Sequence, residues 1–230
     1  MKTIGMLGGM SWESTATYYR LLNEGVKQRL GGLHSASICM VSMDFDELEK
    51  LQHAGDWQGI AQRLSDAARK VAAGGADFLM ICTNTMHEVA DEVAAAVEIP
   101  LLHIADATAR QLQQAGIKRA GLLGTRFTME MDFYTSRIRE LHGIDVLVPD
   151  ASDRELVHRV IYDELCLGKI RNSSRDNFLQ IIDKLKKAGA EAVILGCTEI
   201  AMLVKQDMTA VKLFDTAEIH ALEAVNMALA

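Results

Sequence analysis

The chain has 230 residues, a formal net charge of −7 and a hydrophobic content of 49%. This length predicts one large or two small domains, with a core large enough to fold without a metal or a disulfide. The acidic balance argues against a dedicated nucleic-acid binder or anionic-membrane binder, because both classes need a basic surface.

The thiols are expected to stay reduced and free. The N-terminal residues lack the apolar stretch of a signal peptide, and no run reaches the roughly 18 apolar residues of a membrane-spanning helix. We therefore expect a cytoplasmic protein with no membrane partner, where disulfides are rare. The spacing of the four cysteines fits neither a zinc site nor a CxxC motif, and the glycine-rich start does not fit G-x-G-x-x-G.

Short apolar runs alternate with longer helical patterns along the chain. The predicted strands are residues 3–7, 36–42, 78–82, 101–104, 120–123, 145–148, 192–195 and 211–214. The predicted helices are residues 14–30, 57–73, 86–97, 129–141, 153–167, 173–188 and 216–230. Apolar strands separated by helices are typical of parallel strands covered on both faces. The predicted fold class is therefore α/β.

The two halves of the chain resemble each other. Residues 2–8 resemble residues 118–124 at an offset of 116, and residues 75–81 resemble residues 189–195 at an offset of 114. Such near-register repetition predicts two pseudo-symmetric parallel-sheet lobes.

We expect lobe one to comprise residues 1–103 and 215–230, and lobe two to comprise residues 104–214. The active site is expected in the cleft between the lobes. Ligands of open α/β sheets bind beyond the carboxyl ends of the strands. The turns that follow the strands are therefore the first place to look for reactive side chains.

Two of these turns carry a cysteine among small polar residues. They are residues 82–85, Cys-Thr-Asn-Thr, and residues 196–199, Gly-Cys-Thr-Glu. A helix is also expected directly after each of these turns, where free backbone N–H groups favour an anion and lower the pKa of a thiol. The turns therefore predict a reactive thiolate.

The offset of 114 decides which residues correspond. Cys197 falls on Thr83, and Cys82 falls on Gly196. Because strand side chains alternate between the two faces, Cys82 is predicted to pack behind the turn while Cys197 and Thr83 face the cleft. Cys39, in a strand, and Cys166, in an apolar helical segment, are interpreted as structural.

Four segments together resemble the cofactor-independent aspartate/glutamate racemases, and the enterobacterial L-aspartate/glutamate-specific or broad-specificity members in particular. They are residues 8–15, 82–87, 122–125 and 196–200. The resemblance runs over essentially the whole chain. It implies an amino-acid racemase with no cofactor, a small amino-acid substrate and a homodimeric state. The seven histidines form no H-x-x-x-H or H-E-x-x-H pattern, so no metal site is expected either. The resemblance also implies that one group removes the α-proton and a second group returns a proton to the opposite face.

The chain departs from the usual family pattern at one position. The family pair is two cysteines, and the first directly precedes the Asn-Thr matched here by Asn84 and Thr85. In this chain that residue is Thr83. We therefore expect an asymmetric pair, with Cys197 as the main base and Thr83 as the opposite-face donor. One enantiomer should then be processed much better than the other.

The remaining candidates would bind substrate. Asn84, Thr85 and Thr198 offer donors to a carboxylate, and Glu199 offers a partner for an ammonium group. By resemblance, Met10 and Thr125 match family contact positions, and Lys169 matches a substrate-side lysine. Gln52, in the loop expected after the second strand, would cover the cleft. His87 follows Thr83 by four residues and is expected one turn below it.

Two other interpretations remain open. The missing lobe-one thiol also fits a related enzyme that works with one cysteine, such as a malonate-type decarboxylase or an isomerase of small diacids. A third interpretation is a non-catalytic protein that binds a small carboxylate, although Cys197 beside Thr198 and Glu199 argues against it.

Overall fold

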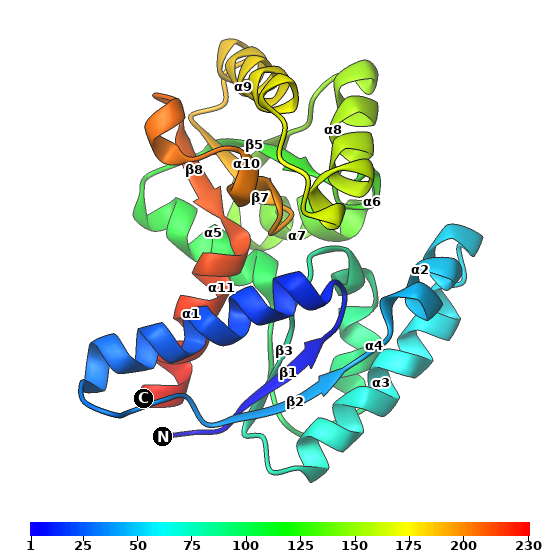
Figure 1. The fold of residues 1–230 in the computed structure, drawn as a ribbon, viewed down its shortest axis with the longest axis vertical. Helices are drawn as coiled ribbons and strands as arrows, with labels where there is room; N and C mark the ends of the chain where they lie inside the picture. The colour runs from blue at the N-terminus through cyan, green and yellow to red at the C-terminus, as the bar shows by residue number, and fades with distance from the viewer. The chain divides into compact units, whose positions relative to one another are not determined.

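The computed structural model describes all 230 residues and contains two compact units (Figure 1). Unit 1 comprises Met1–Ile104 and His220–Ala230, and unit 2 comprises Ala105–Ile219. Each unit holds one four-stranded parallel sheet with helices around it. The predicted α/β class with two parallel-sheet lobes is confirmed. None of the helices combines the length and the apolar character needed to cross a membrane.

Unit 1 is built on a sheet with strand order β2-β1-β3-β4. Its strands are β1 (Ile4–Gly8), β2 (Ile38–Ser42), β3 (Phe78–Ile81) and β4 (Leu101–Leu102). Its helices are α1 (Trp12–Leu30), α2 (Phe45–Ala54), α3 (Trp57–Ala73), the 3-10 helix η1 (Thr85–Val89), α4 (Ala90–Ala95) and most of α11 (Thr216–Leu229).

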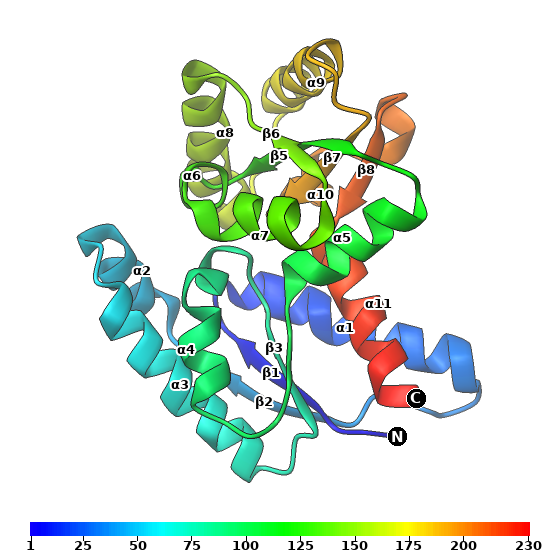
Figure 2. The same cartoon turned by 180° about the vertical axis from the view of Figure 1, so that it is seen from behind.

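Unit 2 repeats this plan with strand order β6-β5-β7-β8 (Figure 2). Its strands are β5 (Arg119–Gly124), β6 (Asp145–Leu147), β7 (Ala192–Gly196) and β8 (Lys212–Asp215). Its helices are α5 (Ile104–Gln114), α6 (Arg126–Glu130), α7 (Asp132–His142), α8 (Ala151–Asp163), η2 (Leu165–Leu167), α9 (Asn172–Lys187), α10 (Ile200–Leu203) and η3 (Gln206–Met208).

The central strands are buried on both faces. Every residue of β1, β3 and β7 is buried, as the nearly continuous apolar runs in the sequence require. On one face of the unit 1 sheet, Leu7 and Ile81 pack into a core with Ile60 and Leu64 of α3. This packing holds the ends of β1 and β3 rigidly, so the turns that follow them start from fixed positions.

The pairing register confirms the internal repeat. In unit 1, Leu7 of β1 pairs with Ile81 of β3. In unit 2, Leu123 of β5 pairs with Leu195 of β7. Residues 7 and 123 are 116 apart and residues 81 and 195 are 114 apart, which are the two offsets of the sequence repeat. The second residue after each strand partner is Thr83 in unit 1 and Cys197 in unit 2.

Two helices were not expected from the sequence. Helix α2 replaces the loop expected around Gln52, because Asp44 caps its start and Gly55 ends it in the left-handed conformation. Helix α5 begins at Ile104, which was expected to belong to a strand. Strand β4 is consequently only two residues long.

Three expected helices are interrupted. The helix expected at residues 129–141 is divided at Met131, whose backbone is extended, into α6 and α7. The helix expected at residues 153–167 leaves the helical conformation at Glu164 and continues as η2. The helix expected at residues 86–97 starts as η1, because His87 N–H bonds to Asn84 O rather than to a residue four positions back.

Gly9, at the end of β1, should tolerate no side chain. Its φ is +92°, and an added Cβ would overlap the backbone of Met43. We expect Gly9→Ala to lose about 1–2 kcal/mol from the left-handed backbone and about 1–3 kcal/mol more from overpacking. Gly55→Ala is the matched control, since Gly55 has a left-handed backbone with a φ of +71° and open space around it. Urea unfolding of both variants tests this, and equal losses would contradict it.

Candidate active site

In the turn after β3, a residue with a buried thiol is followed by a residue with a half-buried hydroxyl. Cys82 is fully buried, and burial raises the pKa of its thiol. Its backbone N–H continues the sheet by bonding to Leu7 O at 2.9 Å. Thr83, the next residue, is half-buried, whereas Asn84 and Thr85 are buried. This agrees with the expectation that Cys82 packs behind the turn.

The turn after β7 has the same form with a thiol in place of the hydroxyl. Gly196 is buried, and Cys197 is half-buried. The Cys197 Sγ donates to Glu199 Oε2 at 2.9 Å, and the Thr198 Oγ1 donates to the same oxygen at 2.8 Å. Glu199 is 6% exposed. A buried carboxylate therefore lies within hydrogen-bond distance of the Cys197 thiol.

The electrostatics of Cys197 differ from the expectation. Burial raises the pKa of the Cys197 thiol well above its usual value, and the charge of Glu199 and the neighbouring Cys166 raise it further. We predicted from the sequence that a helix start lowers the pKa of this thiol, and that prediction is wrong. Helix α10 has only four residues, and a carboxylate lies beside the sulfur. The resting residue is a neutral thiol that donates its hydrogen to Glu199.

Met10 and Thr125 follow the strands that pair with β3 and β7. Met10 is 4% exposed and comes directly after Gly8 and Gly9 at the end of β1. Thr125 follows β5 and caps α6, where its Oγ1 accepts the Thr128 N–H at 3.3 Å. The two positions are 115 residues apart, so they lie in comparable turns of the two units.

Gln52 and Lys169 belong to segments other than these turns. Gln52 is on α2 and is 2% exposed, so it is a packed helix residue rather than part of a surface loop. Lys169 is exposed and follows η2, with its backbone N–H bonded to Glu164 O at 2.9 Å. Unit 1 thus carries Met10, Gln52, Thr83, Asn84 and Thr85, and unit 2 carries Thr125, Lys169, Cys197, Thr198 and Glu199.

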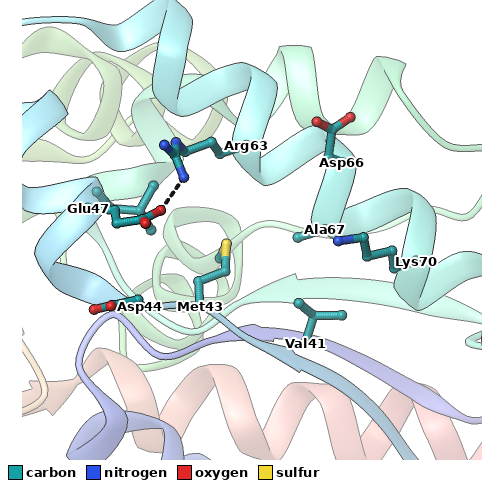
Figure 3. A pocket seen from close by; sticks show the side chains of 9 residues that line it. Val41, Met43, Asp44, Glu47, Arg63, Asp66, Ala67 and Lys70 are labelled. Atoms are coloured by element: carbon teal, nitrogen blue, oxygen red, sulfur yellow. Dashed lines mark hydrogen bonds and ion pairs between the residues drawn. The ribbon is translucent and has the colours of Figure 1, made fainter.

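A surface pocket of about 260 Å³ in unit 1 contains none of the predicted site residues (Figure 3). It is lined by Val41, Met43, Asp44, Glu47, Leu48, Arg63, Asp66, Ala67 and Lys70. Arg63 is paired with Glu47, and the carboxylates of this pocket outnumber its cations. Its charge therefore disfavours an acidic ligand.

Comparison with known proteins gives the family. The model of the Asp/Glu/Hydantoin racemase family matches residues 7–224. The chain belongs to this family. It is accordingly a racemase, a member of the isomerase class.

Solved structures agree with this assignment. A provisionally described Asp/Glu racemase from Yersinia pestis is 55% identical over the whole of both chains, with a TM-score of 0.95. An aspartate racemase homologue from Pyrococcus horikoshii is 34% identical over the whole of both chains, with a TM-score of 0.88. Among curated relatives, the broad specificity amino-acid racemase RacX of Bacillus subtilis is 21% identical over 76% of this chain and 75% of its own.

One acidic residue at a strand end of the racemase, Asp215, was not predicted from the sequence as a site residue. Asp215 ends β8 and pairs in register with Leu195, two residues before Cys197. Burial raises the pKa of its carboxyl to about 6, with smaller contributions from the charges of Glu218 and Glu199, and backbone N–H bonds from Glu218 and Ala217 oppose the rise. Its position directly after the predicted strand 211–214 was a sufficient signal, because the same rule selected Thr83 and Cys197.

The Glu199 carboxylate should set the ionisation of Cys197. We expect Glu199→Gln to lower the pKa of Cys197, because a negative charge beside the sulfur disfavours the thiolate. The measurement is the rate of Cys197 alkylation by iodoacetamide against pH, followed site by site by mass spectrometry.

The expected result is a midpoint at lower pH in Glu199→Gln. Glu155→Gln, which removes an exposed carboxylate from α8, controls for net charge. An unchanged or higher midpoint in Glu199→Gln would refute the assignment.

Proposed function

We propose that this racemase interconverts the L and D forms of aspartate or glutamate without a cofactor. Cys197 acts on one face of the α-carbon and Thr83 acts on the other. The observation that carries the proposal is the register of the repeat, which gives these two residues equivalent positions after β3 and β7. Both are half-buried, while the preceding residues, Cys82 and Gly196, are buried.

Cys197 is the main base. In the resting state its thiol is neutral and bonded to Glu199. An α-ammonium group bound beside Glu199 offsets the carboxylate charge, and this lowers the pKa of the thiol toward the working pH. The thiol loses its proton to solvent, and the thiolate takes the α-proton from one face. The Thr83 hydroxyl gives its proton to the other face and regains one from water. Each 1.36 kcal/mol of stabilisation in the transition state gives about tenfold in rate.

Donors around the two turns hold the substrate carboxylate. The Asn84 amide and the Thr85 hydroxyl lie directly after Thr83, and the Thr198 hydroxyl lies directly after Cys197. Hydrogen bonds to the carboxylate stabilise the negative charge that develops when the α-proton leaves. Met10 and Thr125 complete the contacts from the neighbouring strand ends.

The substrate class is an acidic amino acid. Family membership supports this assignment, and so do the racemase names of the Yersinia pestis and Pyrococcus horikoshii proteins. The exposed Lys169 supplies a cation for the side-chain carboxylate, and Gln52 of α2 contributes its amide to substrate binding. We assign residues 1–103 with 215–230 to one lobe and residues 104–214 to the other. We also propose a cytoplasmic homodimer.

Removal of the thiol should abolish turnover in both directions. We expect Cys197→Ser to lose about 10²–10⁴-fold in kcat for L-Asp, D-Asp, L-Glu and D-Glu, the range typical of a general acid–base group. Circular dichroism of the amino acids follows racemisation, with Cys39→Ser as the thiol control. Comparable turnover of both enantiomers by Cys197→Ser would refute the assignment. Release of carbon dioxide from malonates without racemisation would indicate the decarboxylase instead.

A second thiol at position 83 should make the enzyme more symmetric. A hydroxyl can deliver a proton but is a far poorer base than a thiolate, so wild type should favour one enantiomer as substrate. We expect Thr83→Cys to raise the rate for the disfavoured enantiomer and bring the two kcat values closer. Thr83→Ala is the matched loss of the hydroxyl and should reduce inversion. If neither substitution changes the ratio of the two kcat values, Thr83 does not contact the substrate.

A further inference from the structure

A cluster of buried aromatic and imidazole rings lies behind the Thr83 turn in unit 1. Its members are Tyr18, His87, His103 and His220, each at most 7% exposed. The ring centroids of His87 and His103 are 4.5 Å apart, and those of His87 and His220 are 6.0 Å apart. The ring nitrogens of buried histidines need hydrogen-bond partners.

His87 connects two backbone groups that are distant in sequence. Its Nδ1 lies 2.8 Å from the backbone oxygen of Thr83, and its Nε2 lies 3.3 Å from the backbone nitrogen of Ile104. Ile104 is the first residue of α5 and the residue after which the chain leaves unit 1. The imidazole therefore links the Thr83 turn to the start of that connection.

These partners determine the protonation state of the His87 ring. A carbonyl oxygen only accepts, so Nδ1 carries the hydrogen that is donated to Thr83 O. A backbone N–H only donates, so Nε2 carries the lone pair that accepts from Ile104. Both bonds exist together only in the neutral Nδ1–H tautomer, because an imidazolium would direct a second N–H at the Ile104 N–H.

His220 is held in the opposite tautomer. Its Nε2 lies 2.9 Å from the backbone oxygen of Leu102, so Nε2 carries the hydrogen. In the neutral ring, Nδ1 then accepts the hydroxyl hydrogen of Tyr18, at 3.1 Å. His220 is also the residue at which the chain re-enters unit 1. The chain thus leaves unit 1 at Ile104, which bonds to the His87 ring, and re-enters it at His220, whose ring belongs to the cluster.

We propose that His87 is a positioning residue for the reaction: its neutral Nδ1–H tautomer fixes the carbonyl of Thr83, and so the direction of the Thr83 hydroxyl, relative to the start of α5. The inference rests on the proposed role of Thr83. It assigns His87 no proton transfer to substrate, since both ring nitrogens are occupied by backbone partners.

Two substitutions separate the two bonds of His87. An Asn amide can place a donor near the position of Nδ1 and keep the bond to Thr83 O. A Gln side-chain oxygen can reach the position of Nε2 and keep the bond to Ile104 N–H, but it loses the donor to Thr83. His34→Gln, at an exposed position, controls for loss of a histidine.

The readout is a ratio of two rates in deuterated water. Exchange of the α-proton in recovered substrate reports removal by Cys197, whereas inversion also needs delivery on the Thr83 face. We expect His87→Gln to lower the inversion-to-exchange ratio roughly 10- to 100-fold, as misplacement of a reacting group by about 1 Å does. We expect His87→Asn and His34→Gln to keep a ratio close to that of wild type.

Other results would overturn the inference. An unchanged ratio in His87→Gln, whether both rates persist or both fall together, would make His87 a structural residue only. If wild type shows no exchange that depends on Cys197, the proposed function itself fails. Long-range ¹H–¹⁵N NMR of wild type decides the case in which both His87 variants fail to fold. The Nδ1–H tautomer supports the proposal, and an Nε2–H or doubly protonated ring contradicts it.

Discussion

The backbone hydrogen bonds between paired parallel strands determine which side chains of the two turns leave the sheet. Leu7 pairs with Ile81 in unit 1, and Leu123 pairs with Leu195 in unit 2. Because side chains alternate along a strand, a slip of one residue would direct Cys82 rather than Thr83 out of the turn. The apolar packing on both sheet faces makes such a slip costly, so the chemistry of the turns depends on the core beneath them.

The two turns have the same backbone position but different chemical environments. Cys197 lies beside the buried Glu199, and burial together with that carboxylate raises the pKa of the thiol and keeps it neutral in the resting state. The proposed base is therefore inactive until a cation arrives. The backbone oxygen of Thr83 accepts a hydrogen bond from the neutral ring of His87. A protein with a thiol on one turn and a hydroxyl on the other is suited to a reaction that is faster from one enantiomer.

Much of this arrangement could be predicted from the sequence, because the fold is regular where the site lies. Apolar strands, polar turns and the two offsets were enough to predict the sheets and the equivalence of Thr83 and Cys197. The local pattern did not predict α2, because the segment between Asp44 and Gly55 is rich in polar residues. Gln52 was therefore expected in a loop. The raised pKa of Cys197 depends on burial and on the orientation of one carboxylate, and neither is visible in one dimension. The ring cluster brings together residues 18, 87, 103 and 220, which no local spacing connects.

The central claim is that two different groups act on opposite faces of the α-carbon. The most direct test measures which hydrogen isotope the α-carbon of the product carries after the first turnovers of protiated aspartate or glutamate in deuterated water. The account predicts that the newly formed enantiomer carries solvent deuterium from the first turnover, because the group that delivers the proton is not the group that removed it. A product that keeps the original α-proton would mean that a single base carries it from one face to the other, and would contradict the account.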